Sequence, residues 1–316
     1  LTGSQFSVTT PTSGTSINYI KAGTQVVLLS GVASTANVGT TTITLAAASS
    51  GYDVGFLQVQ PSGGNTRQVV EPGSFVIRSD ASPESIDLAT IAALNAVVGE
   101  TKFYTFGFGG DDTITGWTGV DYIDGGADND SITGGQGSDT FNVSAGTDTI
   151  TDLGNGTDIL IVASGAMANT TVSSSGFTAT AATTNAGTAS LTTNGYAVDL
   201  TLAGGVNGYS ITNTGTATTL KGSANADTIT GGAGADNLSG GDGSDVYVYT
   251  GTSDVDASET ITESPTGTGT DRIRVTGNTQ FNAMTTANFD EIEELEIVGA
   301  VSAEFTGAQL QNETLA

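Results

Sequence analysis

The sequence contains no cysteine and no histidine among its 316 residues. Without cysteine, the chain can form no disulfide bond and offers no thiolate nucleophile or metal ligand. Without histidine, it lacks the base of Ser-His-Asp triads and the zinc ligands of HExxH metalloproteases. These absences exclude thiol chemistry and histidine-dependent hydrolysis as functions of this chain.

Basic residues are scarce as well. Lysine and arginine number 7 against 33 aspartate and glutamate residues, and the formal net charge is −26. Such a chain repels nucleic acids and anionic membranes and attracts cations. No run of about 20 apolar residues is present, so we predict no membrane-spanning segment. The chain begins with Leu1 and shows no signal peptide, and we expect it to be a processed or excerpted piece of a longer protein.

Large apolar side chains are also limited. Aromatic residues make up 6% of the chain and proline only 5 positions, whereas glycine occupies 45. Acidic chains rich in glycine, serine and threonine are often disordered, which is one interpretation of this composition. A strict period in the apolar residues argues against disorder.

That period is a nonapeptide with an aspartate at its sixth position. Two places after each aspartate stands one apolar residue, and glycines crowd the turn before it. The clearest copies are GGADNDSIT (125–133), GGQGSDTFN (134–142), GSANADTIT (222–230), GGAGADNLS (231–239) and GGDGSDVYV (240–248). The aspartates in register are Asp112, Asp121, Asp130, Asp139 and Asp148, followed in a second array by Asp227, Asp236 and Asp245.

Each nonapeptide divides into a six-residue turn and a three-residue strand. Glycines allow the turn backbone to approach closely, so that its carbonyl groups and the aspartate can surround one ion. Calcium takes about six to eight oxygen ligands and needs no nitrogen or sulfur. The pattern therefore predicts a calcium-bound parallel β-roll that holds several Ca²⁺ ions.

Two nonapeptides make one coil, so residues 18 apart are expected to stack on the same edge. Asp112, Asp130 and Asp148 then share one edge, opposite Asp121 and Asp139. In the second array Asp227 stacks with Asp245, opposite Asp236. Without a cation between them, stacked carboxylates would repel one another, and calcium reverses the sign of that interaction.

The tails that follow the two arrays are similar. DTITDLGNGTDILIV (148–162) and ETITESPTGTGTDRIRV (259–275) both read as an acid, TIT, another acid, a turn, GTD and an apolar strand. We therefore interpret the arrays as copies of one module and add Asp158 and Asp271 to the candidate metal ligands. Asp128, in a slot usually held by glycine, is a further candidate.

The predicted fold class is all-β, with calcium-bound β-roll arrays, an N-terminal β-rich module and one short helix. Residues 1–80 are expected to form a sandwich-like module, with β-solenoid coils as the rival interpretation. A helix is expected within 81–100, because Ser82 can cap it and Ile86, Leu88 and Ile91 supply an apolar side. The remaining segments are the first β-roll (101–162), an irregular β-solenoid spacer (163–221), the second β-roll (222–275) and a C-terminal β segment (276–316). Tyr104, Phe106 and Phe108 share one face and are expected to plug the open end of the roll.

The repeats at 107–151 and 222–248 resemble the RTX, or haemolysin-type calcium-binding, family. The family's pattern has glycine where this chain has Phe108, Trp117, Asp128 and Val143. The resemblance implies type I secretion, with the chain unfolded in the low-calcium cytoplasm and folding outside the cell. The family's secretion signal is C-terminal, and QLQNETLA (309–316) matches it poorly.

RTX repeats occur on toxins, proteases, lipases, epimerases, adhesins and surface-layer proteins. The lack of histidine excludes the protease and lipase readings, and Lys21, Lys102 and Lys221 are isolated rather than set in an acylation-type site. We expect no enzyme, but a secreted structural protein that assembles with copies of itself into a bacterial surface layer or extracellular filament. Cell-surface polysaccharide held through calcium is a further expected partner. The alternatives are a calcium-stiffened adhesin segment and the noncatalytic part of a larger secreted enzyme.

Overall fold

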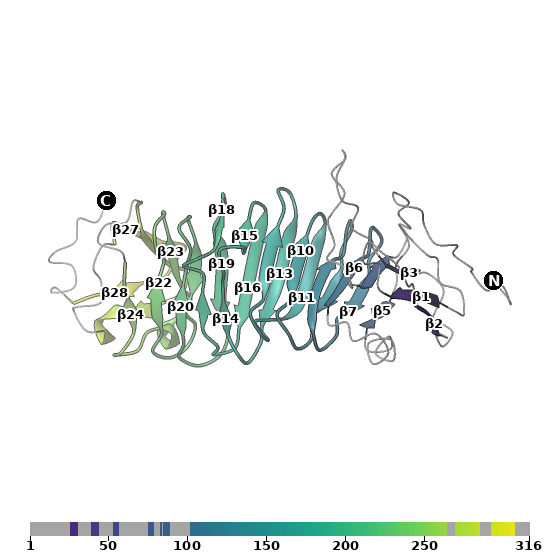
Figure 1. Ribbon diagram of the computed structural model, residues 1–316. Helices are drawn as coiled ribbons and strands as arrows, with labels where there is room; N and C mark the ends of the chain where they lie inside the picture. The colour runs from purple at the N-terminus through teal and green to yellow at the C-terminus, as the bar shows by residue number, and fades with distance from the viewer. Residues whose placement is uncertain are drawn as a thin grey trace.

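The computed structural model describes residues 26–30, 39–43, 53–56, 75–78, 83, 85–88, 102–263, 269–284 and 292–306. The described chain winds into an elongated solenoid whose strands stack one above another from the N-terminal to the C-terminal end (Figure 1). In this part of the chain, no helix has the length and apolar character needed to cross a membrane.

One sheet runs along the whole solenoid. It has 11 strands, and every neighbouring pair is parallel. In chain order the strands are β5 (Ser85–Asp87), β7 (Thr113–Thr115), β9 (Ser131–Thr133), β11 (Thr147–Leu153), β13 (Met167–Val172), β16 (Thr188–Thr193), β19 (Tyr209–Asn213), β21 (Thr228–Thr230), β23 (Val246–Tyr249), β25 (Arg272–Val275) and β27 (Glu294–Ile297).

The other strands of the coils belong to two shorter sheets. An 8-stranded sheet holds β3 (Asp53–Phe56), β4 (Phe75–Arg78), β6 (Lys102–Phe106), β8 (Val120–Asp124), β10 (Thr140–Val143), β12 (Ile159–Val162), β15 (Thr184–Asn185) and β18 (Gly204–Gly205). A 5-stranded sheet holds β14 (Phe177–Thr178), β17 (Val198–Asp199), β20 (Thr219–Lys221), β22 (Asn237–Ser239) and β24 (Thr260–Ile261). The coils between the two arrays contribute strands to all three sheets. In these coils the side of the solenoid that lies across from the long sheet changes from the 8-stranded sheet to the 5-stranded sheet.

Smaller elements lie at the two ends. β1 (Val26–Ser30) pairs with β2 (Gly39–Ile43), and β26 (Thr279–Gln280) pairs with β28 (Ala303–Glu304). Two 3₁₀ turns, η2 (Thr252–Asp254) and η3 (Phe281–Ala283), lie near the C-terminal end.

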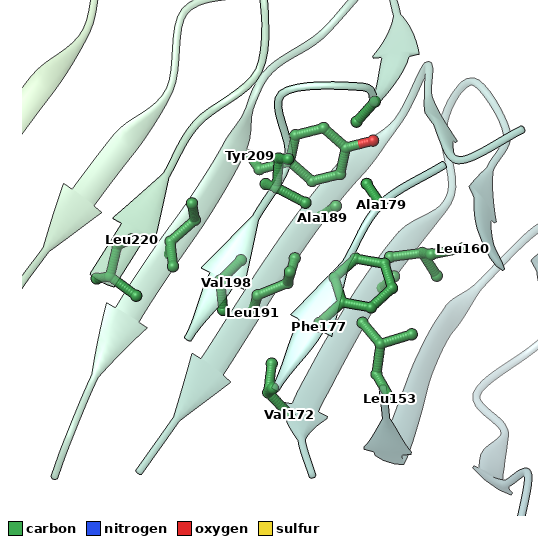
Figure 2. Packing of buried hydrophobic residues seen from close by; sticks show 14 of the residues in the cluster. Leu153, Leu160, Val172, Phe177, Ala179, Ala189, Leu191, Val198, Tyr209 and Leu220 are labelled. Carbon is green, nitrogen blue, oxygen red and sulfur yellow. The ribbon is translucent and has the colours of Figure 1, made fainter. Parts of the chain in front are cut away.

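The core consists of apolar ladders that follow the strand register. Ile86, Ile114, Ile132 and Ile150 are aligned on consecutive strands of the long sheet, and all four are buried. Side chains alternate between the two faces of a strand, so a three-residue strand points its middle residue inward. Figure 2 shows the same packing in the middle coils, where Leu153, Phe177, Leu191, Val198 and Leu220 point into one continuous core. The apolar residue of each nonapeptide is therefore its contribution to the core.

The structure corrects the predicted helix at its start. Ser85–Asp87 forms strand β5, which pairs in parallel with β7, and both Ile86 and Leu88 are buried. Apolar residues two apart fit a strand, and pairing with β7 satisfies backbone groups that a helix would leave open at the edge of the sheet. The rest of the predicted helix lies outside the described residues, as does most of the predicted module 1–80.

The aromatic residues near the start of the first array were also placed wrongly by the sequence pattern. Tyr104 and Phe106 lie on the outer face of the 8-stranded sheet, where their rings are 5.6 and 5.8 Å from that of Tyr122. Phe103 and Thr105 are the buried residues of β6. Because β6 lies between β4 and β8, its outward side chains cover a wall of the solenoid and do not plug its end.

Candidate metal centres

The aspartates of the first array form two hydrogen-bonded rows. On one edge, Oδ1 of Asp130 accepts the backbone N–H of Asp112 at 2.8 Å, and Oδ1 of Asp148 accepts that of Asp130 at 3.2 Å. On the other edge, Oδ1 of Asp139 accepts the N–H of Asp121 at 2.9 Å. Each carboxylate therefore bonds the coil before it, and the expected stacking of residues 18 apart is confirmed.

Asp158 continues the second of these rows. Its Oδ1 accepts the N–H of Asp139 at 2.9 Å, and its Oδ2 accepts the N–H of Gly154 at 2.7 Å. At the start of the same row, Phe103 of β6 is aligned with Asp121. The row therefore begins at Asp121, because the coil before it has Phe103 at the position of the aspartate.

The second array repeats the arrangement. The N–H of Asp227 donates to Oδ1 of Asp245 at 2.7 Å, and the N–H of Asp245 donates to Oδ1 of Asp271 at 2.8 Å. The N–H of Asp271 in turn donates to Oε2 of Glu293 at 2.7 Å. On the opposite edge, the N–H of Asp236 donates to Oε2 of Glu259 at 2.7 Å.

Two members of these rows, Glu259 and Glu293, were not predicted from the sequence. Glu259 holds the place that Asp148 has in the first array, and the matching tails were the signal that could have identified it. Glu293 lies outside every nonapeptide and was not a candidate ligand, yet its carboxylate ends the row that runs through Asp271. No period could have found Glu293, because it lies 22 residues beyond Asp271 rather than 18.

Where glycine holds the first position of the nonapeptide, it makes room for the carboxylate at the sixth. A Cβ at Gly125 would lie 2.1 Å from Oδ2 of Asp130, and one at Gly240 would lie 2.1 Å from Oδ2 of Asp245. At the second position, the positive φ of Gly126 (107°) is a backbone conformation that favours glycine. The first glycine of the pair therefore leaves space for the carboxylate, and the second allows the backbone conformation of the turn.

The second oxygen of several carboxylates has no partner within the protein. Oδ2 of Asp130, Asp148, Asp236 and Asp245 is buried and accepts no hydrogen bond from the described residues. A buried acceptor without a partner is costly, and native proteins rarely leave one. A hard cation bound by carboxylate and backbone oxygens supplies what these atoms lack, so the residues present fit calcium.

Burial raises the pKa of the aspartates in the rows. It raises the pKa of Asp139 to about 8 and the pKa of Asp121, Asp148 and Asp245 to about 7, because the charged forms lose their hydration. Backbone N–H donors oppose the effect only in part, and neighbouring carboxylates add to it for Asp139, Asp148 and Asp245. A bound cation favours the charged forms and so removes this conflict.

Asp128 has a different environment. It is exposed in its turn with a positive φ of 74°, and its Oδ2 accepts the N–H of Gly110 at 3.1 Å. It lies outside the buried rows, and its role as a calcium ligand stays a prediction.

Filling the space beside one carboxylate tests its importance. We expect Gly125→Ala to lower the free energy of unfolding by about 1–3 kcal/mol, because the new Cβ overlaps Oδ2 and Cγ of Asp130. Calcium binding should weaken with it. Gly251→Ala is the matched control, since a Cβ there meets nothing within 4 Å and the backbone φ is −178°. Thermal unfolding and calcium titration of both variants make the comparison, and equal behaviour would contradict the role of the glycine.

Comparison with known proteins supports the same chemistry. Residues 106–123, 118–150 and 212–247 match the family model of the RTX calcium-binding nonapeptide repeat (4 copies). All eight aspartates at the sixth position fall within these stretches. No curated protein and no solved structure matches the chain. Residues 106–150 and 212–247 therefore carry RTX calcium-binding nonapeptide repeats, through which the chain binds several calcium ions.

Proposed function

We propose that this chain is a noncatalytic, secreted structural protein that assembles with copies of itself into a bacterial surface layer or extracellular filament. The observation that carries the proposal is the single 11-stranded sheet that joins both calcium-binding arrays into one solenoid. The family match supports secretion, because RTX repeats are typical of secreted proteins.

The proposed calcium ligands are the acids of the rows and the turn backbone beside them. On the first array these are Asp112, Asp121, Asp130, Asp139, Asp148 and Asp158, and on the second they are Asp227, Asp236, Asp245 and Asp271. All ten side chains are buried. The carboxylates of Asp130, Asp148 and Asp245 bridge two coils when Oδ1 accepts an amide of the coil before it and the otherwise unpartnered Oδ2 binds an ion. Calcium then holds consecutive coils together and stiffens the solenoid.

Electrostatics makes assembly depend on calcium as well. Copies with a net charge of −26 repel one another, and the effect is strongest at low ionic strength. Divalent cations at the exposed acids reduce this repulsion and can bridge two subunits, or a subunit and an acidic polysaccharide. Calcium therefore serves the proposed function twice, within each subunit and between subunits.

Electron microscopy of the purified protein tests the proposal. We expect ordered lattices or filaments in millimolar calcium and none after calcium is removed. Magnesium at the same concentration is the control, because its smaller octahedral shell fits these sites poorly. Particles that stay monomeric at every calcium concentration would contradict self-assembly, and glycan binding by such monomers would favour an adhesin segment.

A further inference from the structure

Three carboxylates from separate parts of the second array converge at its C-terminal end. Asp245 precedes β23, Glu263 follows β24 and Asp271 precedes β25. All three are buried, and each offers an oxygen that lies within 4.8 Å of the oxygens of the other two. Asp245 and Asp271 belong to the row described above, whereas Glu263 lies outside every nonapeptide and outside the row.

Glu263 has one engaged oxygen and one without a partner. Its Oε1 accepts hydrogen bonds from the Tyr247 hydroxyl and from the N–H of Gly240. Its Oε2 is buried and has no partner with hydrogen-bond geometry among the described residues, although the N–H of Gly241 is close enough to favour its charged form; Oδ2 of Asp245 is likewise buried and without a partner. The glutamate itself is only 7% exposed. Two buried, unpartnered carboxylate oxygens in one cluster therefore point to a bound cation.

The nearest basic side chains in the sequence do not neutralise the cluster. Arg272, next to Asp271, donates from its Nε to Oε2 of Glu294 at 2.6 Å and makes a second ion pair with Glu296. Arg274 donates to the same Glu296 oxygen at 2.8 Å. Both guanidinium groups are thus held by the acids of β27.

The first array shows what is special about this cluster. Asp152 is the counterpart of Glu263, and its two oxygens accept the N–H groups of Gly134 and Gly135 at 2.8 and 2.7 Å. Phe141 is the counterpart of Tyr247 and has no hydroxyl to donate. In the second array a longer acid and a tyrosine replace this pair, and the tyrosine holds one carboxylate oxygen while the other stays without a partner.

We propose that Asp245, Glu263 and Asp271 bind one calcium ion in a site made of three side-chain carboxylates. The affinity of calcium sites depends on the number of charged ligands and on the rigidity of the site, and this buried cluster offers three carboxylates. An ion at this site is therefore expected to bind tightly. It fixes the segment after β24 to the turn before β23 and so closes the array, whether or not the subunits assemble.

Counting bound calcium in the whole chain tests the site. Glu263→Gln should weaken calcium binding at this one site about tenfold or more, and so remove one ion from the count at calcium concentrations that just saturate the unaltered chain, because one of three charged ligands is lost. Asp256→Asn is the matched control, since it removes one charge from an exposed acid of the same array. Equilibrium dialysis gives the number of ions, and circular dichroism in saturating calcium shows that each variant is folded. A full count with unchanged tight binding in Glu263→Gln would overturn the proposal.

Terbium luminescence gives an independent test that leaves the carboxylates intact. Terbium is a hard cation that binds calcium sites and emits when a nearby aromatic ring transfers energy to it. Because the Tyr247 hydroxyl contacts Glu263, the terbium ion that binds at this site should lose most of its sensitised emission in Tyr247→Phe, so the total sensitised emission at saturation should fall while the number of bound ions stays the same. Unchanged emission would show that no ion lies beside Tyr247 and would overturn the proposal. Both measurements report ion binding to single subunits in solution. Their outcome is therefore independent of whether the protein forms lattices or filaments.

Discussion

Removal of calcium at neutral pH is expected to unfold most of the solenoid. The carboxylates of the rows are buried, and holding one of them charged with its pKa raised from 3.8 to about 7 costs roughly 4 kcal/mol. Whole domains are typically stable by about 5–15 kcal/mol, so a few such groups outweigh the stability of the fold. Far-UV circular dichroism in excess chelator should therefore lose most of the β signal.

Restoring the metal provides the control for this experiment. Calcium added in excess of the chelator should return the β signal, and magnesium at the same free concentration should not, because the two ions differ in size and coordination. A full native β signal in excess chelator at neutral pH would contradict the idea that calcium holds the coils together.

Acidification of the calcium-free protein is expected to restore stability. Folding raises the pKa of Asp139, Glu259 and Glu263 to about 8, above the values of 3.8 and 4.5 that apply to aspartate and glutamate in the unfolded chain. Between pH 8 and about pH 4 the folded state therefore binds more protons than the unfolded state. The contribution of these groups to stability is fully present below the unfolded pKa and is lost as the pH rises through the folded pKa.

The measurement is a series of thermal unfolding curves between pH 8 and pH 4. Calcium should be removed by gel filtration beforehand, since chelators themselves take up protons in this range. The calcium-loaded protein is the control and should change in the opposite direction, because protons compete with calcium for the same oxygens. A calcium-free protein whose stability stays constant or falls on acidification would contradict this expectation.

The period of the sequence predicted the parts of the fold that repeat. Ile114, Ile132 and Ile150 were identified as inward residues because one apolar side chain recurs in each nonapeptide, and the stacked aspartates followed from the same spacing. The helix prediction was wrong at its start because local capping signals at Ser82 were weighed without the open edge of β7, which Ile86 and its strand cover. Long-range pairing decided the conformation there, and a single sequence does not display it.

Some acids of the second array belong to the rows although the nine-residue period does not predict them. Asp271 follows Asp245 by 26 residues and still occupies the same row. Glu259 and Glu293 also belong to rows, although neither is an aspartate in register. Glu263 could not be predicted, since its importance depends on the hydroxyl of Tyr247 and on a buried oxygen without a partner.

The hydrogen bonds in the rows all run in one direction, as do the strands of the long sheet, so the solenoid has two unlike ends. The carboxylates of Asp130, Asp139, Asp245 and Asp271 each accept an amide of the coil before them. An end-on contact between two copies that continues the parallel long sheet must therefore be head-to-tail, because two like ends would meet with their strands antiparallel. Head-to-tail contacts are heterologous and generate open filaments or closed rings rather than two-fold dimers.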